Sequence, residues 1–170
     1  LIIFALSIAK GRYLSFRAQS PEDYSGTGPA FKMTENLNGE ILSEGLLFGP
    51  KGKMTNSFSA EMVGTWYGDT GTLSEEFAYS NGRQQSRKWF LQLGPGNTFS
   101  ATADDIVGEA KGSVSGATVK MEYQITLPEE AGGHVLNVTD WLYLTESGVI
   151  MNKSEMRKFG IKVAELVATM

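Results

Sequence analysis

The chain has 170 residues, a formal net charge of −4 and no cysteine. A domain of about 150 residues buries roughly 70% of its unfolded surface, so a single domain with a substantial core is expected. The acidic balance argues against a nucleic-acid partner, because domains that bind nucleic acid usually carry a basic patch or a pI above about 9. The lack of cysteine excludes disulfides, thiolate metal sites and thiol catalysis.

The chain begins with an apolar run, LIIFALSIA, which is followed by Lys10, Arg12 and Arg17. This run is too short to cross a hydrocarbon core, which needs about 20 helical residues. We interpret residues 1–18 as the end of a membrane anchor or signal segment with its basic flank. A short apolar strand or helix packed on the domain is the alternative. Residues 19–37 are rich in Pro, Gly, Ser and Thr without a clear period, which predicts a linker-like lead-in.

From residue 38 to residue 170 the pattern is typical of β-structure. Segments 54–63 and 119–127 alternate apolar and polar residues, which is the period of half-buried strands. Turn sequences such as YGDTG, SNGR, LGPGN and ESG recur at intervals of about ten residues. Parallel strands need crossovers of a dozen or more residues, so neighbouring strands should pair antiparallel. We predict an all-β domain over 38–170, an antiparallel up-and-down barrel of about ten strands that leaves no exposed edge.

The turn Asn81-Gly82 is a strong signal for a two-residue hairpin loop. With this loop, Glu75 would lie opposite Lys88 and Glu76 opposite Arg87. Opposite charges that face each other across two strands contribute roughly 0.2–1 kcal/mol per pair. We interpret Glu75 and Lys88 as a solvated ion pair.

The sequence ESG predicts a second hairpin, with a three-residue loop and Gly148 in the left-handed conformation. This register places Asp140 opposite Ser154 and Leu142 opposite Asn152. The inner face of the hairpin would then carry polar groups among apolar ones. Such groups are either buried structural residues or part of a binding site.

The same hairpin places Trp141 opposite Lys153, a geometry that allows a cation–π contact. Ser154 is expected to cap a short helical turn, EMRKF, which Gly160 would end before the last strand.

That helical turn would carry Lys158 over the end of the barrel toward Asp140. Asp140, Asn152 and Lys158 would then form a polar plug that closes the barrel. We favour this structural role over a ligand site, because a buried carboxylate needs a charged or hydrogen-bonding partner.

Several motifs resemble the bacterial domain-of-unknown-function family 3833: GTWYGDTGTLSEEFAYSNG (64–82), RKW (87–89), DDIVGEAKG (104–112), and DWLYL with IMNKSEMRKFGIKVAE (140–165). The positions characteristic of the family are Trp66, Arg87, Trp89, Asp105, Gly108, Asp140, Trp141, Asn152, Lys158 and Gly160. The resemblance implies a lipocalin-like barrel. It also implies an exported protein at a membrane, because family members are mostly described as lipoproteins.

A lipoprotein would carry a lipid-modified cysteine, which this chain lacks, so attachment would depend on residues 1–18. We expect a membrane-associated protein on the periplasmic side. The basic flank favours the alternative, the cytoplasmic face of the inner membrane.

Signals for catalysis are weak. The single histidine, His134, lies in a Gly-rich turn, so the common zinc sites are unavailable. Asp104 and Asp105 are adjacent and would point to opposite faces of a strand, and we interpret Asp105 as a turn former. The sequence has no nucleophile elbow and no nucleotide-binding glycine pattern. We therefore predict no cofactor, no metal site and no catalytic residue, and leave enzymatic activity open.

The leading hypothesis is a monomeric barrel that binds or carries a fatty acid, a lipid or another small apolar molecule, since closed barrels of this size hold one small ligand. The alternatives are a structural envelope module with a filled barrel and an enzyme acting on a lipid. The candidate ligand-binding residues are Arg87, Trp89, Tyr123, Asp140, Asn152 and Lys158.

Overall fold

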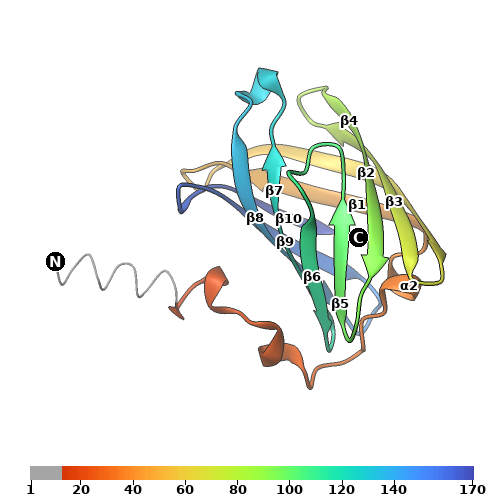
Figure 1. Cartoon of the computed structure of the whole chain (residues 1–170). Helices are drawn as coiled ribbons and strands as arrows, with labels where there is room; N and C mark the ends of the chain where they lie inside the picture. Colours follow the sequence, from red (N-terminus) through yellow and green to blue (C-terminus); the bar gives the residue numbers. More distant parts are fainter. Residues whose placement is uncertain (1–12) are drawn as a thin grey trace.

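The computed structural model describes residues 13–170, so most of the proposed anchor, 1–12, lies outside the described residues. Ten strands close into one barrel in the order β1-β10-β9-β8-β7-β6-β5-β4-β3-β2 (Figure 1). Each strand pairs antiparallel with its neighbours in the chain, and β1 closes the barrel by pairing with β10. The predicted antiparallel all-β barrel is confirmed.

The strands are β1 (Gly39–Phe48), β2 (Met54–Tyr67), β3 (Thr70–Tyr79), β4 (Gln84–Leu93), β5 (Thr98–Thr102), β6 (Ala110–Ser115), β7 (Thr118–Thr126), β8 (Val135–Leu144), β9 (Ile150–Lys158) and β10 (Ile161–Thr169). Short helical segments are η1 (Phe16–Ala18), η2 (Pro21–Tyr24), α2 (Met33–Asn36) and η3 (Glu129–Ala131). Among residues 13–170, no helix has the length and apolar character needed to span a membrane.

The barrel interior is built from strand alternation. On β2, Phe58, Ala60 and Met62 are buried, whereas Ser59 and Glu61 between them are exposed. Burying a large apolar side chain contributes roughly 1.5–3 kcal/mol, so each inward position stabilises the closed sheet.

Glycine makes room for interior aromatic rings on two strand pairs. Gly45 on β1 lies opposite Phe58, and a Cβ there would overlap the Phe58 ring. Gly112 on β6 likewise lies opposite Phe99 on β5, and a Cβ there would overlap the Phe99 ring. The rings therefore fold over the glycines and fill the interior.

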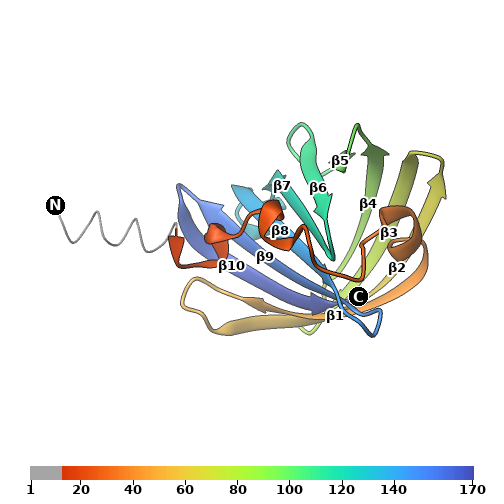
Figure 2. The same cartoon turned by 90° about the horizontal axis from the view of Figure 1, so that it is seen from below.

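The lead-in to β1 is packed on the barrel, although its composition is that of a linker. Figure 2 shows it crossing the barrel before it reaches α2. Its Tyr24 ring meets Trp141 edge-on, with centroids 5.3 Å apart, and Trp141 is fully buried on the outer face of β8. Both Tyr24 and Tyr143 donate hydrogen bonds to Gln19 Oε1, at 2.6 and 2.5 Å.

The end of the lead-in covers one end of the barrel interior. Phe31, Met33 and Leu37 are buried in the core. The Leu37 carbonyl accepts a hydrogen bond from Trp66 Nε1 on β2 at 2.9 Å. This contact leaves no room for a side chain at Gly64, where a Cβ would overlap that carbonyl oxygen.

The β8–β9 hairpin has the predicted register. Asp140 lies opposite Ser154 and Leu142 opposite Asn152, and Gly148 has a positive φ of 85°. The expected Trp141–Lys153 cation–π contact is replaced by another, because the Lys153 ammonium lies 5.3 Å from the Phe16 ring of the lead-in.

The predicted two-residue loop at Asn81-Gly82 is wrong by one residue. Tyr79 N–H bonds to the Arg83 carbonyl, which gives a three-residue loop with Gly82 at φ 85°. Glu75 consequently pairs with Arg87 rather than with Lys88.

The predicted helical turn EMRKF is also wrong. β9 continues as a strand to Lys158, and the chain turns at Phe159 and Gly160. Met156 pairs with Val138 on one side and with Ala164 on the other. Pairing on both sides satisfies the backbone hydrogen bonds of this segment as a strand. Its tertiary context therefore overrides its weak helix propensity.

Candidate functional site

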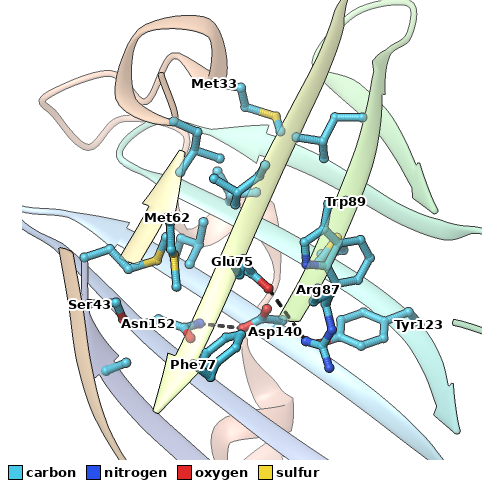
Figure 3. A pocket seen from close by; sticks show the side chains of 18 of the residues that line it. Met33, Ser43, Met62, Glu75, Phe77, Arg87, Trp89, Tyr123, Asp140 and Asn152 are labelled. Atoms are coloured by element: carbon cyan, nitrogen blue, oxygen red, sulfur yellow. Dashed lines mark hydrogen bonds and ion pairs between the residues drawn. The ribbon is translucent and has the colours of Figure 1, made fainter. Parts of the chain in front are cut away.

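A cavity of about 120 Å³ lies inside the barrel (Figure 3). Its apolar lining consists of Met33, Leu37, Phe58, Met62, Leu73, Phe77, Trp89, Leu91, Phe99, Val119, Met121, Leu142, Ala168 and Met170. Its polar lining consists of Ser43, Glu75, Arg87, Tyr123, Asp140 and Asn152. Apolar walls with a few placed polar groups are typical of ligand sites.

Arg87 points into the barrel from β4 and pairs with Asp105 in the loop after β5. Its Nε and Nη2 donate hydrogen bonds to Asp105 Oδ2 at 3.0 and 2.6 Å. Both side chains are largely buried, with 17% and 25% of their surface exposed. Asp105 therefore has a partner for its charge and is more than the turn former that the sequence suggested.

Glu75 lies beside Arg87 on β3 and is 7% exposed. The nearest guanidinium nitrogen is Arg87 Nη1, 3.9 Å from Glu75 Oε2, which is beyond hydrogen-bond distance. Oε2 is buried and has no hydrogen-bond partner within residues 13–170. Burial raises the pKa of Glu75 to about 7, because the Arg87 charge offsets only part of the desolvation.

Asp140 enters the cavity from β8 and is held by two neighbours on β9. Its Oδ1 accepts hydrogen bonds from Asn152 Nδ2 at 2.5 Å and from Ser154 Oγ at 2.6 Å. Burial raises the pKa of Asp140, and these two hydrogen bonds oppose the change. The Asp140 charge also repels that of Glu75, which further favours the protonated form of Glu75.

Two aromatic side chains complete the polar side of the cavity. Trp89 and Tyr123 meet edge-on with ring centroids 5.4 Å apart, and the Arg87 guanidinium carbon lies 5.8 Å from the Trp89 ring. Burial raises the pKa of Tyr123, so its hydroxyl stays protonated. Tyr123 therefore contributes a neutral hydroxyl group that can donate a hydrogen bond to a ligand.

The structure brings five of the six predicted ligand-binding residues together: Arg87, Trp89, Tyr123, Asp140 and Asn152 all line the cavity. Lys158 does not join them. Its Nζ lies 2.7 Å from His134 Nδ1 at the exposed end of β9. The prediction that Lys158 joins Asp140 and Asn152 in a polar plug is therefore wrong, because β9 continues as a strand where a helical turn was expected.

Sequence reasoning missed Ser43 and Glu75 as cavity residues. In the part of the chain that the structure describes, Ser43 Oγ is buried without a hydrogen-bond partner, as is Glu75 Oε2. A signal for Glu75 was present, because it shares its strand face with Leu73 and Phe77. No comparable sequence signal marks Ser43.

We predict that Arg87→Met lowers the free energy of unfolding by about 3 kcal/mol. Breaking a buried ion pair costs about 3–5 kcal/mol, and the partial exposure of this pair favours the lower value. Urea denaturation measures the change, with Lys88→Met on the outer face of β4 as the control. A second measurement in an Asp105→Asn background should show a smaller loss; equal losses in both backgrounds would contradict the pairing.

We also predict that stability falls as the pH rises from about 4.5 to 7. Glu75 has a folded-state pKa of about 7 and an ordinary value of 4.5, so the folded state binds the extra proton in this window. Glu75→Gln should remove this decline and stabilise the protein at pH 8 by roughly 3 kcal/mol. Thermal melts from pH 4 to pH 8 test this, and Glu76→Gln on the outer face should keep the decline. An unchanged pH profile in Glu75→Gln would refute the assignment.

The barrel is similar to a solved structure described as "Crystal Structure of Rv2717c from M. tuberculosis", with a TM-score of 0.58 and 16% sequence identity. The similarity covers 84% of this chain and 96% of that one, and at this identity it shows the fold alone. No curated protein matches the sequence. The family model described as "Protein of unknown function (DUF3833)" matches residues 12–170, and the chain belongs to this family.

Proposed function

We propose that the barrel binds a small apolar molecule, or the apolar end of a lipid, in its interior. The observation that carries this proposal is the cavity of about 120 Å³, with aromatic, methionine and aliphatic walls and polar groups on one side. A barrel serving only as a structural module would fill this space with its own side chains.

The cavity volume limits the size of the ligand. An engineered apolar cavity of about 150 Å³ holds benzene, so this smaller cavity limits the enclosed part of a ligand to about one ring. Drug-sized ligands occupy pockets of about 300–1,000 Å³. We therefore favour a small molecule, or one end of a longer chain, over a whole long-chain lipid.

Unpartnered polar atoms also support a binding role. Ser43 Oγ and Glu75 Oε2 both belong to residues of the cavity lining and find no hydrogen-bond partner among the described residues. Nearly all buried polar atoms in native proteins are hydrogen bonded, so such exceptions need an explanation. A bound molecule with hydrogen-bond donors would provide one.

An enzyme that acts on the bound molecule is the second candidate. Glu75 favours it, because a carboxyl with a pKa near 7 at a cavity wall suits proton transfer at neutral pH. Mass spectrometry after prolonged incubation shows whether the bound molecule is chemically unchanged. An unchanged molecule would support a carrier over an enzyme.

We predict that the full chain binds small apolar probes, and that Ser43→Leu abolishes binding. The larger leucine side chain would occupy the cavity, and the serine hydroxyl that it replaces makes no hydrogen bond that would be lost. Native mass spectrometry after purification from membranes and competition against a small, uncharged, apolar fluorescent probe measure binding. Ser59→Leu, on the exposed face of β2, is the control. No bound molecule and no displacement at high micromolar ligand would contradict the proposal.

We further propose that residues 1–18 attach the barrel to a membrane, with the barrel on the periplasmic side. The apolar run LIIFALSIA and the resemblance to exported lipoproteins support this placement.

The full chain should therefore sediment with membranes, whereas a chain starting at Gln19 should remain in the supernatant. Cell fractionation with immunoblotting tests attachment. A reporter fusion that is active only in the cytoplasm would place the barrel on the opposite side.

A further inference from the structure

The polar side of the cavity carries more negative than positive groups. Glu75 and Asp140 contribute two carboxyl groups to the lining, and Arg87 contributes the guanidinium. Asp105, just outside the lining, takes two hydrogen bonds from that guanidinium. Asp105 thus takes the closest contacts of Arg87, and the two lining carboxyls share the attraction of that one guanidinium without a hydrogen bond from it.

Two oxygens of this wall have no hydrogen-bond partner among the described residues. An ionised carboxylate is acceptor only, and Glu75 Oε2 has no hydrogen bond. Ser43 Oγ, on β1, is a second buried oxygen without a partner. In Figure 3 Glu75 points toward Arg87 and Asp140, while Ser43 lies near Asn152.

The apolar walls lie close to these acceptors. Phe77 follows Glu75 by two positions on the same face of β3, and Met62 lies opposite Glu75 on β2. Trp89 lines the cavity beside Arg87 on β4. A cation held near Glu75 would lie near aromatic rings, which attract cations through their π faces.

We propose that the cavity selects a small apolar amine, whose ammonium group pairs with Glu75 while its hydrocarbon part packs against the apolar wall. This inference rests on the proposed binding function and names the ligand class for the same site. An anionic ligand is disfavoured, because a carboxylate would add a buried negative charge next to Glu75 and Asp140. Arg87 offers it only partial compensation, since Nε and Nη2 are already bonded to Asp105.

The pairing predicts how binding depends on pH. The charged groups that act on Glu75 are Arg87 on β4, Asp105 in the β5–β6 loop and Asp140 on β8. The phenols of Tyr79 on β3 and Tyr123 on β7 are titratable groups that also interact with it, and both have a raised pKa. The net result is a Glu75 pKa of about 7, so Glu75 is mostly protonated at pH 6 and mostly ionised at pH 8. A primary alkylamine, like lysine with a pKa of about 10.4, stays protonated at both. Amine affinity should therefore rise from pH 6 to pH 8.

Three ligands that share one ring test the inference: cyclohexylamine, cyclohexanol and cyclohexanecarboxylate. Isothermal titration calorimetry with the full chain at pH 8 should give an affinity for the amine roughly tenfold or more above that for the alcohol, as expected for a hydrogen bond to a buried charge. The carboxylate should not bind measurably. The preference for the amine should shrink at pH 6.

Glu75→Gln should reduce amine affinity to that of the alcohol and abolish its pH dependence, while alcohol binding persists. Glu75→Asp, which keeps the charge, should retain the preference for the amine. Glu76→Gln is the matched control, because Glu76 is exposed on the opposite face of β3 and accepts a hydrogen bond from Ser86 there. It should bind all three ligands as the unmodified chain does.

The outcomes separate this inference from the proposed function. Equal affinity for amine and alcohol at pH 8, or tighter binding of the carboxylate, would overturn the amine preference and leave a binding barrel. Retention of the preference in Glu75→Gln would overturn the role of Glu75. If none of the three ligands binds and none displaces the uncharged fluorescent probe, the proposed function fails as well.

Discussion

The guanidinium of Arg87 is the charge on which the arrangement of the barrel interior depends. It bonds to Asp105 through two nitrogens and lies 3.9 Å from Glu75, so it connects β4 to the loop after β5 and to β3. An uncompensated carboxylate inside a protein is costly, and this single cation offsets two of them. Nε and Nη2 are used within the protein, and Glu75 Oε2 accepts no hydrogen bond from any described residue. The same interaction therefore stabilises the fold and sets the character of the site.

The outer face of the barrel has a separate organising contact. Trp141 points away from the cavity and is fully buried, because the lead-in places Tyr24 against its ring. The lead-in then reaches α2 and ends at Leu37, whose carbonyl accepts a hydrogen bond from Trp66. One end of the cavity is thus formed by residues that precede the first strand. This packing also explains why aromatic residues occur on both faces of the sheet.

The β3–β4 hairpin has a register that its turn sequence alone does not determine. A loop of two residues rather than three moves the partner of Glu75 from Arg87 to Lys88. A register shift of one residue moves every side chain of a strand to the opposite face of the sheet. Asn81-Gly82 suits either loop, so the turn alone could not decide. The apolar face of β3, with Leu73 and Phe77, contained the missing information and places Glu75 inside.

The sequence by itself determined the class of fold, the antiparallel order of the strands and the β8–β9 register, because alternation and turn chemistry are local properties. It also identified Arg87 and Asp140 as residues of interest. Only the tertiary structure decided that Asp105 reaches Arg87, that Glu75 Oε2 finds no hydrogen-bond partner among the described residues, and that Lys158 turns to His134 instead of Asp140. These contacts join distant segments, and their geometry depends on how the whole sheet closes, which no local pattern records.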